Sequence, residues 1–399
     1  SYVGTLGSPG TRDYRPGVIL CPAGGCLNVF SQPPVGFCTL IRPLHTRSLV
    51  LRPHVTQFTA GHGVYGPAEI SRTAHGFCQL DGLVNFHAGQ RHLTTVPLNC
   101  RPNKNLYFVV NRGNSFALIS TASNGRVRCL NGCSTGWISL SGIAYQAGNS
   151  NQVNLPLTSA ASRGTDNSFN GVATVAVNAD GMCSVTGAVR LASNYHHTAS
   201  IATLPVNCRP RKRLVFTLSR NYAYTRVDVM QNGNIHVYNS HSQGRDLSLS
   251  GINFKTNQDA ATVTNIPLVS GATNFGGAYG PPTFSVSAGL CVLSGLTRTG
   301  TTIGRIASLP ASCQPKKRLV FTLGRTDNPA RIDVLTNGDV HWLSGGSGTW
   351  VSFTGISFVA RAAAPEVVQS QGGAGIDFYP TWTLTTRVWT DRVYTFNNL

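Results

Sequence analysis

The stretch LPVNCRPRKRLVFTL (204–218) recurs as LPASCQPKKRLVFTL (309–323) and, more diverged, as VPLNCRPNKNLYFVV (96–110). The cysteines inside the motif, Cys100, Cys208 and Cys313, are separated by 108 and 105 residues. Solenoid repeats have periods of roughly 20–50 residues, whereas a period of this length is the size of a small domain. The sequence therefore predicts three tandem copies of one domain.

Each copy is followed by an Asn-Gly pair and then by a shared closing phrase. The closing phrases are WISLSGIAY (137–145), LSLSGINF (247–254) and WVSFTGISF (350–358). Apolar residues alternate with period two in TRVDVMQ (225–231), which is typical of a strand with one buried face. Asn232-Gly233 lies between two such strands and predicts a type I′ hairpin turn, with positive φ at both residues.

Short strands with frequent turns predict an all-β chain of three antiparallel β-sandwich, jelly-roll-like domains. Three such domains could form a pseudo-threefold group or lie as beads along a filament. The expected division is an irregular Pro/Gly/Cys-rich arm (1–50), three repeats (51–146, 147–255 and 256–360), and a linker with a C-terminal β tail (361–399).

Six of the eleven cysteines occupy equivalent places in the repeats. They predict one disulfide per repeat, namely Cys78–Cys100, Cys183–Cys208 and Cys291–Cys313. Disulfides indicate an oxidising compartment, so we expect an extracellular or virion-surface location. The alternative is that these are buried free thiols duplicated with the domain. The sequence assigns no role to Cys21, Cys26, Cys38, Cys129 and Cys133, whose spacing lacks a second matching pair for zinc.

The chain is strongly basic, with a formal net charge of +18, which favours polyanionic partners. The cations recur just after the motif cysteines, and we take them as candidates for polyanion binding. They are Arg101, Lys104, Arg209, Arg211, Lys212, Arg213, Lys316, Lys317 and Arg318. The alternative is structural: cations at the start of a strand discourage edge-to-edge pairing.

Signals of catalysis are weak, since the chain has only 14 acidic residues and none of the common nucleophile, phosphate or metalloprotease motifs. Asp228 and Asp333 lie two residues from Arg226 and Arg331, which predicts same-strand ion pairs on an outer sheet surface. We therefore expect no enzyme activity, cofactor or metal. No stretch has the roughly 20 apolar residues of a membrane span.

The pattern of an LP-x-x-C-R-P motif, an Asn-Gly and a WISLSGI-like phrase resembles β-sandwich domains of phage tail fibres and receptor-binding proteins. It is most similar to Cys-containing repeats in uncharacterised dinoflagellate and algal proteins. The resemblance covers about three quarters of the chain. It implies non-enzymatic, β-rich domains that often associate in threes. Cys208 and Cys313 replace a Tyr of the phage pattern.

These features predict a non-catalytic structural or adhesive protein of an extracellular appendage, fibre or coat. It would act through self-assembly with copies of itself or other coat subunits, or by binding glycans or acidic polysaccharide. The alternative is a basic scaffold in a nucleic-acid-containing assembly, such as a capsid or ribosome-associated protein. A carbohydrate-active enzyme built on sandwiches is a third reading.

Overall fold

The fold is known from a computed structural model of the whole chain. It describes residues 18–20, 39–41, 44–58, 64–87, 91–148, 152–164, 171–221, 223–238, 246–256, 263–300, 302–325, 328–345 and 349–361. The chain divides into two units, residues 1–41 with 366–399, and residues 42–365. In the first unit the described residues form an antiparallel pair, β1 (Val18–Leu20) and β2 (Thr39–Ile41). The expected C-terminal tail lies outside the described residues.

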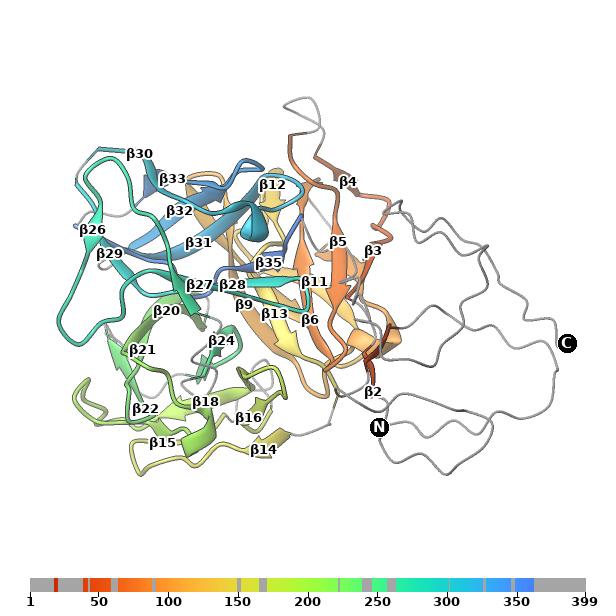
Figure 1. Cartoon of the computed structure of the whole chain (residues 1–399). Coiled ribbons are helices and arrows are strands. Elements are labelled where there is room, and N and C mark those ends of the chain that lie inside the picture. The colour runs from red at the N-terminus through yellow and green to blue at the C-terminus, as the bar shows by residue number, and fades with distance from the viewer. Residues whose placement is uncertain are drawn as a thin grey trace, which may run out of the picture. The chain divides into compact units, whose positions relative to one another are not determined.

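The second unit is built from antiparallel strands, and the all-β class is confirmed. Among the described residues the only helices are three short 3₁₀ turns, η1 (Leu98–Cys100), η2 (Val206–Cys208) and η4 (Ala311–Cys313). Each turn follows a proline and ends on a motif cysteine. We refer to residues 44–148, 152–256 and 263–361 as repeats 1, 2 and 3, which Figure 1 draws in orange to yellow, green, and teal to blue.

Repeat 1 contains three antiparallel sheets, β13-β6-β5-β3, β12-β7-β4 and β8-β11-β10-β9. Its strands are β3 (His45–Ser48), β4 (Val55–Gln57), β5 (Glu69–Arg72), β6 (Phe77–Asp81), β7 (Leu83–Phe86), β8 (His92–Thr95), β9 (Leu106–Arg112), β10 (Ser115–Thr121), β11 (Arg126–Asn131), β12 (Gly136–Ser139) and β13 (Ile143–Gln146). Residues of the expected arm also take part in this repeat, since β3 pairs with β5 and Leu49 is buried in the same core.

Repeat 2 has the four-stranded sheet β14-β16-β17-β24 and a seven-stranded sheet β15-β18-β23-β20-β21-β22-β19, in which the pairing of β20 with β23 joins two sheets that are separate in repeat 1. Its strands are β14 (Gln152–Asn154), β15 (Ala161–Arg163), β16 (Thr174–Val177), β17 (Met182–Thr186), β18 (Ala188–Leu191), β19 (Ala202–Thr203), β20 (Leu214–Arg220), β21 (Ala223–Val229), β22 (Asn234–Tyr238), β23 (Asp246–Ser248) and β24 (Ile252–Lys255).

Repeat 3 contains sheets β25-β27-β28-β35, β26-β29-β34 and β30-β33-β32-β31. Its strands are β25 (Val263–Asn265), β26 (Thr273–Asn274), β27 (Thr283–Ser287), β28 (Leu290–Ser294), β29 (Leu296–Arg298), β30 (Gly304–Ser308), β31 (Leu319–Arg325), β32 (Asn328–Val334), β33 (Asp339–Gly345), β34 (Trp350–Ser352) and β35 (Ser357–Val359).

Each repeat encloses its own hydrophobic core. The phenylalanine of the repeated motif packs against the aromatic residue that ends the closing phrase. The ring centroids of Phe216 and Phe254 are 6.3 Å apart, and those of Phe108 and Tyr145 are 6.0 Å apart. The repeated motif and the closing phrase, which are the stretches most similar among the repeats, therefore pack against each other in the core.

The Asn-Gly turns differ from the expected type I′ form. Only the glycines have positive φ, at 86°, 91° and 89° for Gly125, Gly233 and Gly338. The asparagine instead accepts a hydrogen bond from the backbone N–H two residues on, as in Asn124 Oδ1 to Arg126 N at 3.1 Å. Gly125 N also donates to Ala122 O. This pattern matches a type I turn followed by a left-handed glycine, the three-residue hairpin loop.

All three repeats also have a glycine between the strand that carries the first disulfide cysteine and the strand after it, as between β6 and β7. Gly82, Gly187 and Gly295 have φ of 102°, 96° and 102°. A Cβ at Gly295 would lie 2.1 Å from Pro281 O, inside any tolerable contact. Both the backbone angle and the close approach of the neighbouring chain therefore require glycine here.

We predict that Gly295→Ala destabilises the protein by at least about 2 kcal/mol more than Gly113→Ala. Gly113 also has positive φ, but a Cβ there meets nothing within 4 Å. Urea unfolding of the two variants isolates the steric part of the cost. Similar midpoints for both would contradict the close approach seen at Gly295.

Candidate functional site

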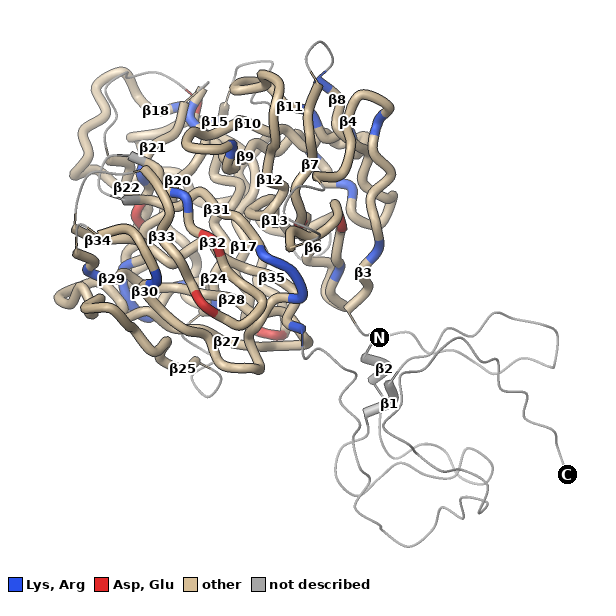
Figure 2. Tube along the Cα trace, turned by 90° about the horizontal axis from the view of Figure 1, so that it is seen from above, with Lys and Arg blue, Asp and Glu red and all other residues tan. Residues whose placement is uncertain are grey.

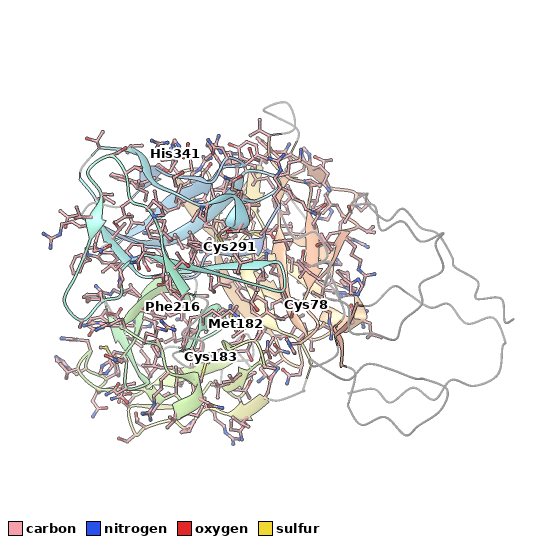
Figure 3. All side chains as sticks on the ribbon, viewed as in Figure 1. Cys78, Met182, Cys183, Phe216, Cys291 and His341 are labelled. Carbon is pink, nitrogen blue, oxygen red and sulfur yellow. A yellow bond between two sulfur atoms is a disulfide. The ribbon has the colours of Figure 1, made fainter. Side chains whose placement is uncertain are left out.

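Each motif cysteine is joined to an earlier strand of the same repeat, β6, β17 or β28. The disulfides are Cys78–Cys100, Cys183–Cys208 and Cys291–Cys313, and a fourth, Cys129–Cys133, closes the loop after β11. Figure 3 labels Cys78, Cys183 and Cys291, one from each repeat. Cys21, Cys26 and Cys38 lie outside the described residues.

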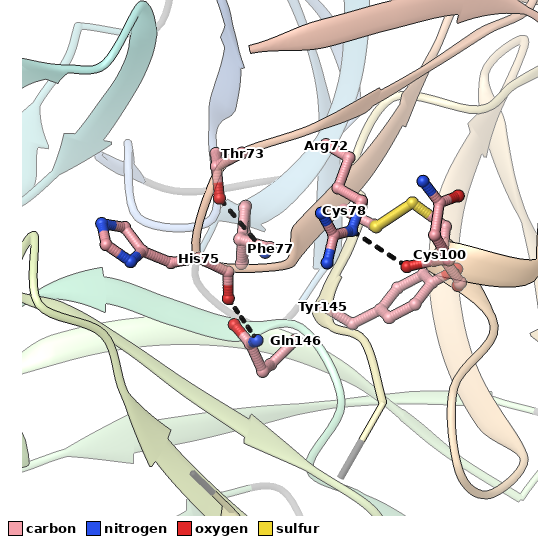
Figure 4. Close-up of a disulfide and its surroundings, with 9 residues drawn as sticks. Arg72, Thr73, His75, Phe77, Cys78, Cys100, Tyr145 and Gln146 are labelled. Atoms are coloured by element: carbon pink, nitrogen blue, oxygen red, sulfur yellow. Dashed lines mark hydrogen bonds between the residues drawn. A yellow bond between two sulfur atoms is a disulfide. The ribbon is translucent and has the colours of Figure 1, made fainter. Parts of the chain in front are cut away.

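Figure 4 shows the first of these bonds, Cys78–Cys100, and the residues around it. The buried Tyr145 hydroxyl donates to Cys100 O at 2.7 Å, and Arg72 Nε donates to Asn99 O at 3.0 Å. Burial raises the pKa of Tyr145, so its hydroxyl stays protonated and remains a donor. The segment that carries the cations therefore begins at an anchored residue, Cys100.

The three repeats contact one another through equivalent residues. The hydroxyls of Ser139, Ser248 and Ser352, all from the closing phrases, donate to backbone carbonyls of the next repeat's central strand. The bonds are Ser139 to Val320 O at 2.6 Å, Ser248 to Tyr107 O at 3.0 Å, and Ser352 to Val215 O at 2.7 Å. Repeat 1 thus bonds to repeat 3, repeat 3 to repeat 2, and repeat 2 to repeat 1.

A small apolar cluster also joins all three repeats. Phe77, Met182 and Leu290 each directly precede a disulfide cysteine, and they pack together with Ala144 and Val292. Because successive strand residues face opposite sides, the cysteine enters its own core while the residue before it faces the other repeats. The label of Met182 in Figure 3 marks this cluster.

Two of the junctions between repeats bury a carboxylate between two arginines. Asp228 is completely buried and is bound by Arg213 Nε at 2.6 Å and by Arg226 Nε at 2.7 Å. Repeat 3 covers this cluster, since Arg213 lies 4.7 Å from the Tyr279 ring centre and Arg226 lies 5.0 Å from that of Trp350.

The equivalent cluster lies between repeats 3 and 1. Asp333, also completely buried, is bound by Arg318 Nε at 2.7 Å and Arg331 Nε at 2.8 Å. The covering aromatics are Tyr65 and Trp137 of repeat 1. Burial opposes the charge on Arg226 and Arg331, but hydrogen bonds and charge from the aspartates outweigh it and raise both pKa values.

These clusters correct the expectation of exposed ion pairs at Asp228 and Asp333. Alternation along the strand predicts that both acids lie on the sheet face away from the core of their own repeat, and they do. That face is not exposed, because the next repeat covers it. The third junction has no such cluster: at the equivalent positions stand Asn105, Leu118 and Ser120, and Tyr107 packs on Ala188 and Leu130.

The nine predicted polyanion-binding cations do not form one surface. Arg213 and Arg318 belong to the buried clusters. Lys104, Lys212 and Lys317 lie against Gly171, Gly280 and Gly66 of the neighbouring repeat. Arg101 and Arg209 lie against the Asn-Gly turns, while Lys212, Lys316 and Lys317 remain exposed and Arg211 is half-buried.

Lys104 shows the structural use of these cations most clearly. Its Nζ donates to Val172 O and Thr174 Oγ1 of repeat 2, both at 2.8 Å. Burial lowers its pKa to about 8. A side chain engaged in this way links repeat 1 to repeat 2, and two of its three donors are already used.

The central strands β9, β20 and β31 pack side by side and line a depression of about 30 Å³. Equivalent residues of the three repeats line it, among them Phe108, Phe216 and Phe321. A buried water needs roughly 10–15 Å³, so this space accepts one or two waters and no larger molecule. In the described residues no group of three or more His, Cys, Asp or Glu side chains could hold a metal.

Comparison with known proteins gives no further guidance: no family model, no curated protein and no solved structure matches the chain. In the part of the chain that the structure describes, no helix is long and apolar enough to cross a membrane.

The closing-phrase serines were missed by sequence reasoning. The signal was present, since a serine precedes the Leu-Ser-Gly or Phe-Thr-Gly step in all three copies. A polar residue that recurs in an otherwise apolar phrase indicates a buried hydrogen bond, although its partner cannot be read from the sequence.

We predict that Asp228→Asn destabilises the protein by about 3 kcal/mol, because two largely enclosed arginines lose their buried counter-charge. The matched control is Asp339→Asn, which removes the carboxylate of the more exposed Arg305–Asp339 pair and should cost less than about 1 kcal/mol. Urea unfolding compares the two, and equal costs would show that the Asp228 cluster adds no stability beyond a surface pair.

Asp81 is a half-buried residue whose Oδ1 is buried without a hydrogen-bond partner and whose cross-strand neighbour is Glu69. Burial raises its pKa to about 7, and the Glu69 charge adds to this, although a hydrogen bond from Gln79 offsets part of it. The folded state therefore holds this proton more tightly than the unfolded chain, and its contribution to stability is lost as the pH rises from about 4 to about 7.

We predict that Asp81→Asn abolishes this pH dependence. Relative to the variant, the native protein should lose up to about 4 kcal/mol of stability between pH 4 and pH 8. Chemical unfolding at both pH values measures the difference, and a constant difference between the two proteins would refute the raised pKa.

Proposed function

We propose that this chain is a non-catalytic structural or adhesive protein of an extracellular appendage, fibre or surface coat, built as a covalent pseudo-trimer of β-sandwich domains. The observation that carries the proposal is the closed cycle of serine–carbonyl bonds, in which each repeat binds the next and the third binds the first. A head-to-tail contact that closes in this way gives a compact ring, whereas one that does not close gives a filament.

The disulfides support the proposed location. Four disulfides among the described residues are typical of proteins that fold in an oxidising compartment. This supports a secreted appendage or virion surface over a cytosolic setting. It also supports binding partners that occur outside cells, such as glycans, other coat subunits or copies of this chain.

Binding rather than catalysis is supported by where the acids lie. Asp228 and Asp333 are fully occupied by arginines, and the axial depression holds no more than one or two waters. General acid–base chemistry needs a carboxyl that can reach a substrate. The outward faces of the repeats are left as the surfaces through which the protein acts.

The second candidate is a basic scaffold in a nucleic-acid-containing assembly, and the net charge of +18 favours it. Charge alone binds nucleic acid without regard to sequence, with an affinity that falls steeply with salt. The disulfides and the use of many cations between repeats weigh against it.

We predict that the purified, oxidised chain sediments as a compact body and that electron microscopy shows particles with three lobes, alone or in ordered assemblies. Incubation with soluble glycans should leave them intact while glycan-coated surfaces or copies of the chain retain the protein. An extended string of beads would contradict the pseudo-trimer. Glycan hydrolysis, or failure of the protein both to assemble and to bind glycans, would contradict the proposed function.

A further inference from the structure

The sheet β8-β11-β10-β9 of repeat 1 carries a group of arginines that neither of the other repeats has. Arg126 and Arg128 lie on β11 with exposed side chains, while Val127 between them is buried. Arg128 is the direct cross-strand partner of His92 on β8. Arg52 lies on the next segment outward, where its N–H donates to Leu93 O. We refer to Arg52, His92, Arg126 and Arg128 as the repeat 1 basic face.

The basic face has no neutralising partner. The sheet β8-β11-β10-β9 contains no Asp or Glu, and none of the three arginines makes an ion pair or side-chain hydrogen bond with a described residue. The two acids of repeat 1 that the structure describes, Glu69 and Asp81, lie on the sheet formed by β5 and β6. In Figure 2, Lys and Arg segments mark the region around β8 and β11 without an Asp or Glu segment among them.

The three arginines lie close enough to act on one point. Burial lowers the pKa of His92, and the charges of Arg52, Arg126 and Arg128 lower it further. Residues two apart on a strand are separated by roughly 7 Å and lie on the same face. Arg126 and Arg128 therefore place two guanidinium groups in a row along β11, with Arg52 on the adjacent segment. Arginine forks bind carboxylate, sulfate and phosphate groups in two-point fashion.

The same positions in repeats 2 and 3 show that the face is not a requirement of the fold. Aligned on the Asn-Gly turns, Arg126 corresponds to Asn234 and Asp339, and Arg128 corresponds to His236 and His341. Aligned on the bridges of Leu51, Leu157 and Leu268 to the neighbouring strand, Arg52 corresponds to Thr158 and Val269. In repeat 3 the one arginine at this place, Arg305, is paired with Asp339.

We propose that the repeat 1 basic face binds an acidic polysaccharide, one that carries sulfate or carboxylate groups along its chain. This rests on the proposed function, which places the protein outside the cell, where such polymers are the abundant polyanions. Nucleic acid fits less well, because the aromatic residues of this sheet, Tyr107 and Phe108, are buried and Phe116 packs on Tyr224 of repeat 2. No Phe, Tyr or Trp ring on the described part of the sheet is exposed for base stacking, which leaves only the half-buried imidazole of His92.

The test is a triple variant, Arg52→Thr, Arg126→Asn and Arg128→His, which gives repeat 1 the residues of repeat 2. Because repeat 2 folds with these residues at the same positions, the variant should keep the native unfolding midpoint. The control removes three other exposed cations, through Lys212→Asn, Lys316→Asn and Lys317→Asn. Affinities of the full chain are measured for heparin as the sulfated probe, polygalacturonate as the carboxylated probe, and a DNA duplex of similar length.

We expect the triple variant to bind at least one polysaccharide ten times more weakly or worse, with a salt dependence reduced by about two to three in logarithmic slope. The control should stay within about threefold of the native protein. The two polysaccharide probes identify whether sulfate or carboxylate is preferred.

Four outcomes would overturn the proposal. Equal losses in variant and control would show that binding depends on total charge, and tighter binding of DNA than of either polysaccharide through the same arginines would assign the face to nucleic acid. If the native chain binds a polysaccharide and the variant binds equally well, the face is wrong but the proposed function stands. If the native chain binds neither polysaccharide, both this proposal and the glycan-binding part of the proposed function are wrong. The sedimentation and microscopy described above test self-assembly separately.

Discussion

The structure depends on the burial of one face of each central strand by the next repeat. In repeats 2 and 3 the neighbouring strands, β21 and β32, carry arginine and aspartate on the same sheet face. Charges cannot be removed from water without mutual pairing and hydrogen bonds. Asp228 and Asp333 therefore each receive two guanidinium groups, while aromatic rings of the covering repeat close the site from above. The pairing ties the covering repeat to a defined position, because a shift would leave a buried charge unpaired.

The three junctions are equivalent in their hydroxyl bonds but not in their charges. The junction of repeats 1 and 2 replaces the arginine–aspartate cluster with Tyr107, Ala188 and Leu130. Apolar packing tolerates small displacements better than a buried ion pair, since it has no direction. The repeats thus share one geometry of contact while the chemistry of that contact has diverged.

Much of the fold could be predicted from the sequence, because strand alternation and repeated phrases are local signals. The positions of the cysteine pairs also follow from comparison of one repeat with another. The burial of Asp228 could not be predicted: alternation shows that its side chain leaves the core of its own repeat, but not that Tyr279 and Trp350 of another repeat lie beyond it. The prediction of the turn type was wrong for a similar reason. The side chain of Asn124 accepts a hydrogen bond from the backbone N–H of Arg126, so the turn does not need positive φ at Asn124.

Fusion of three copies into one chain changes what a single substitution can do. In a trimer of identical subunits, an arginine at the position of Arg126 would appear on all three sides. Here it appears once, opposed by asparagine and aspartate at the matching places. A polymer that recognises this side would find one attachment point per molecule. Binding would then be monovalent and would orient the protein, with the other two sides left to contact something else.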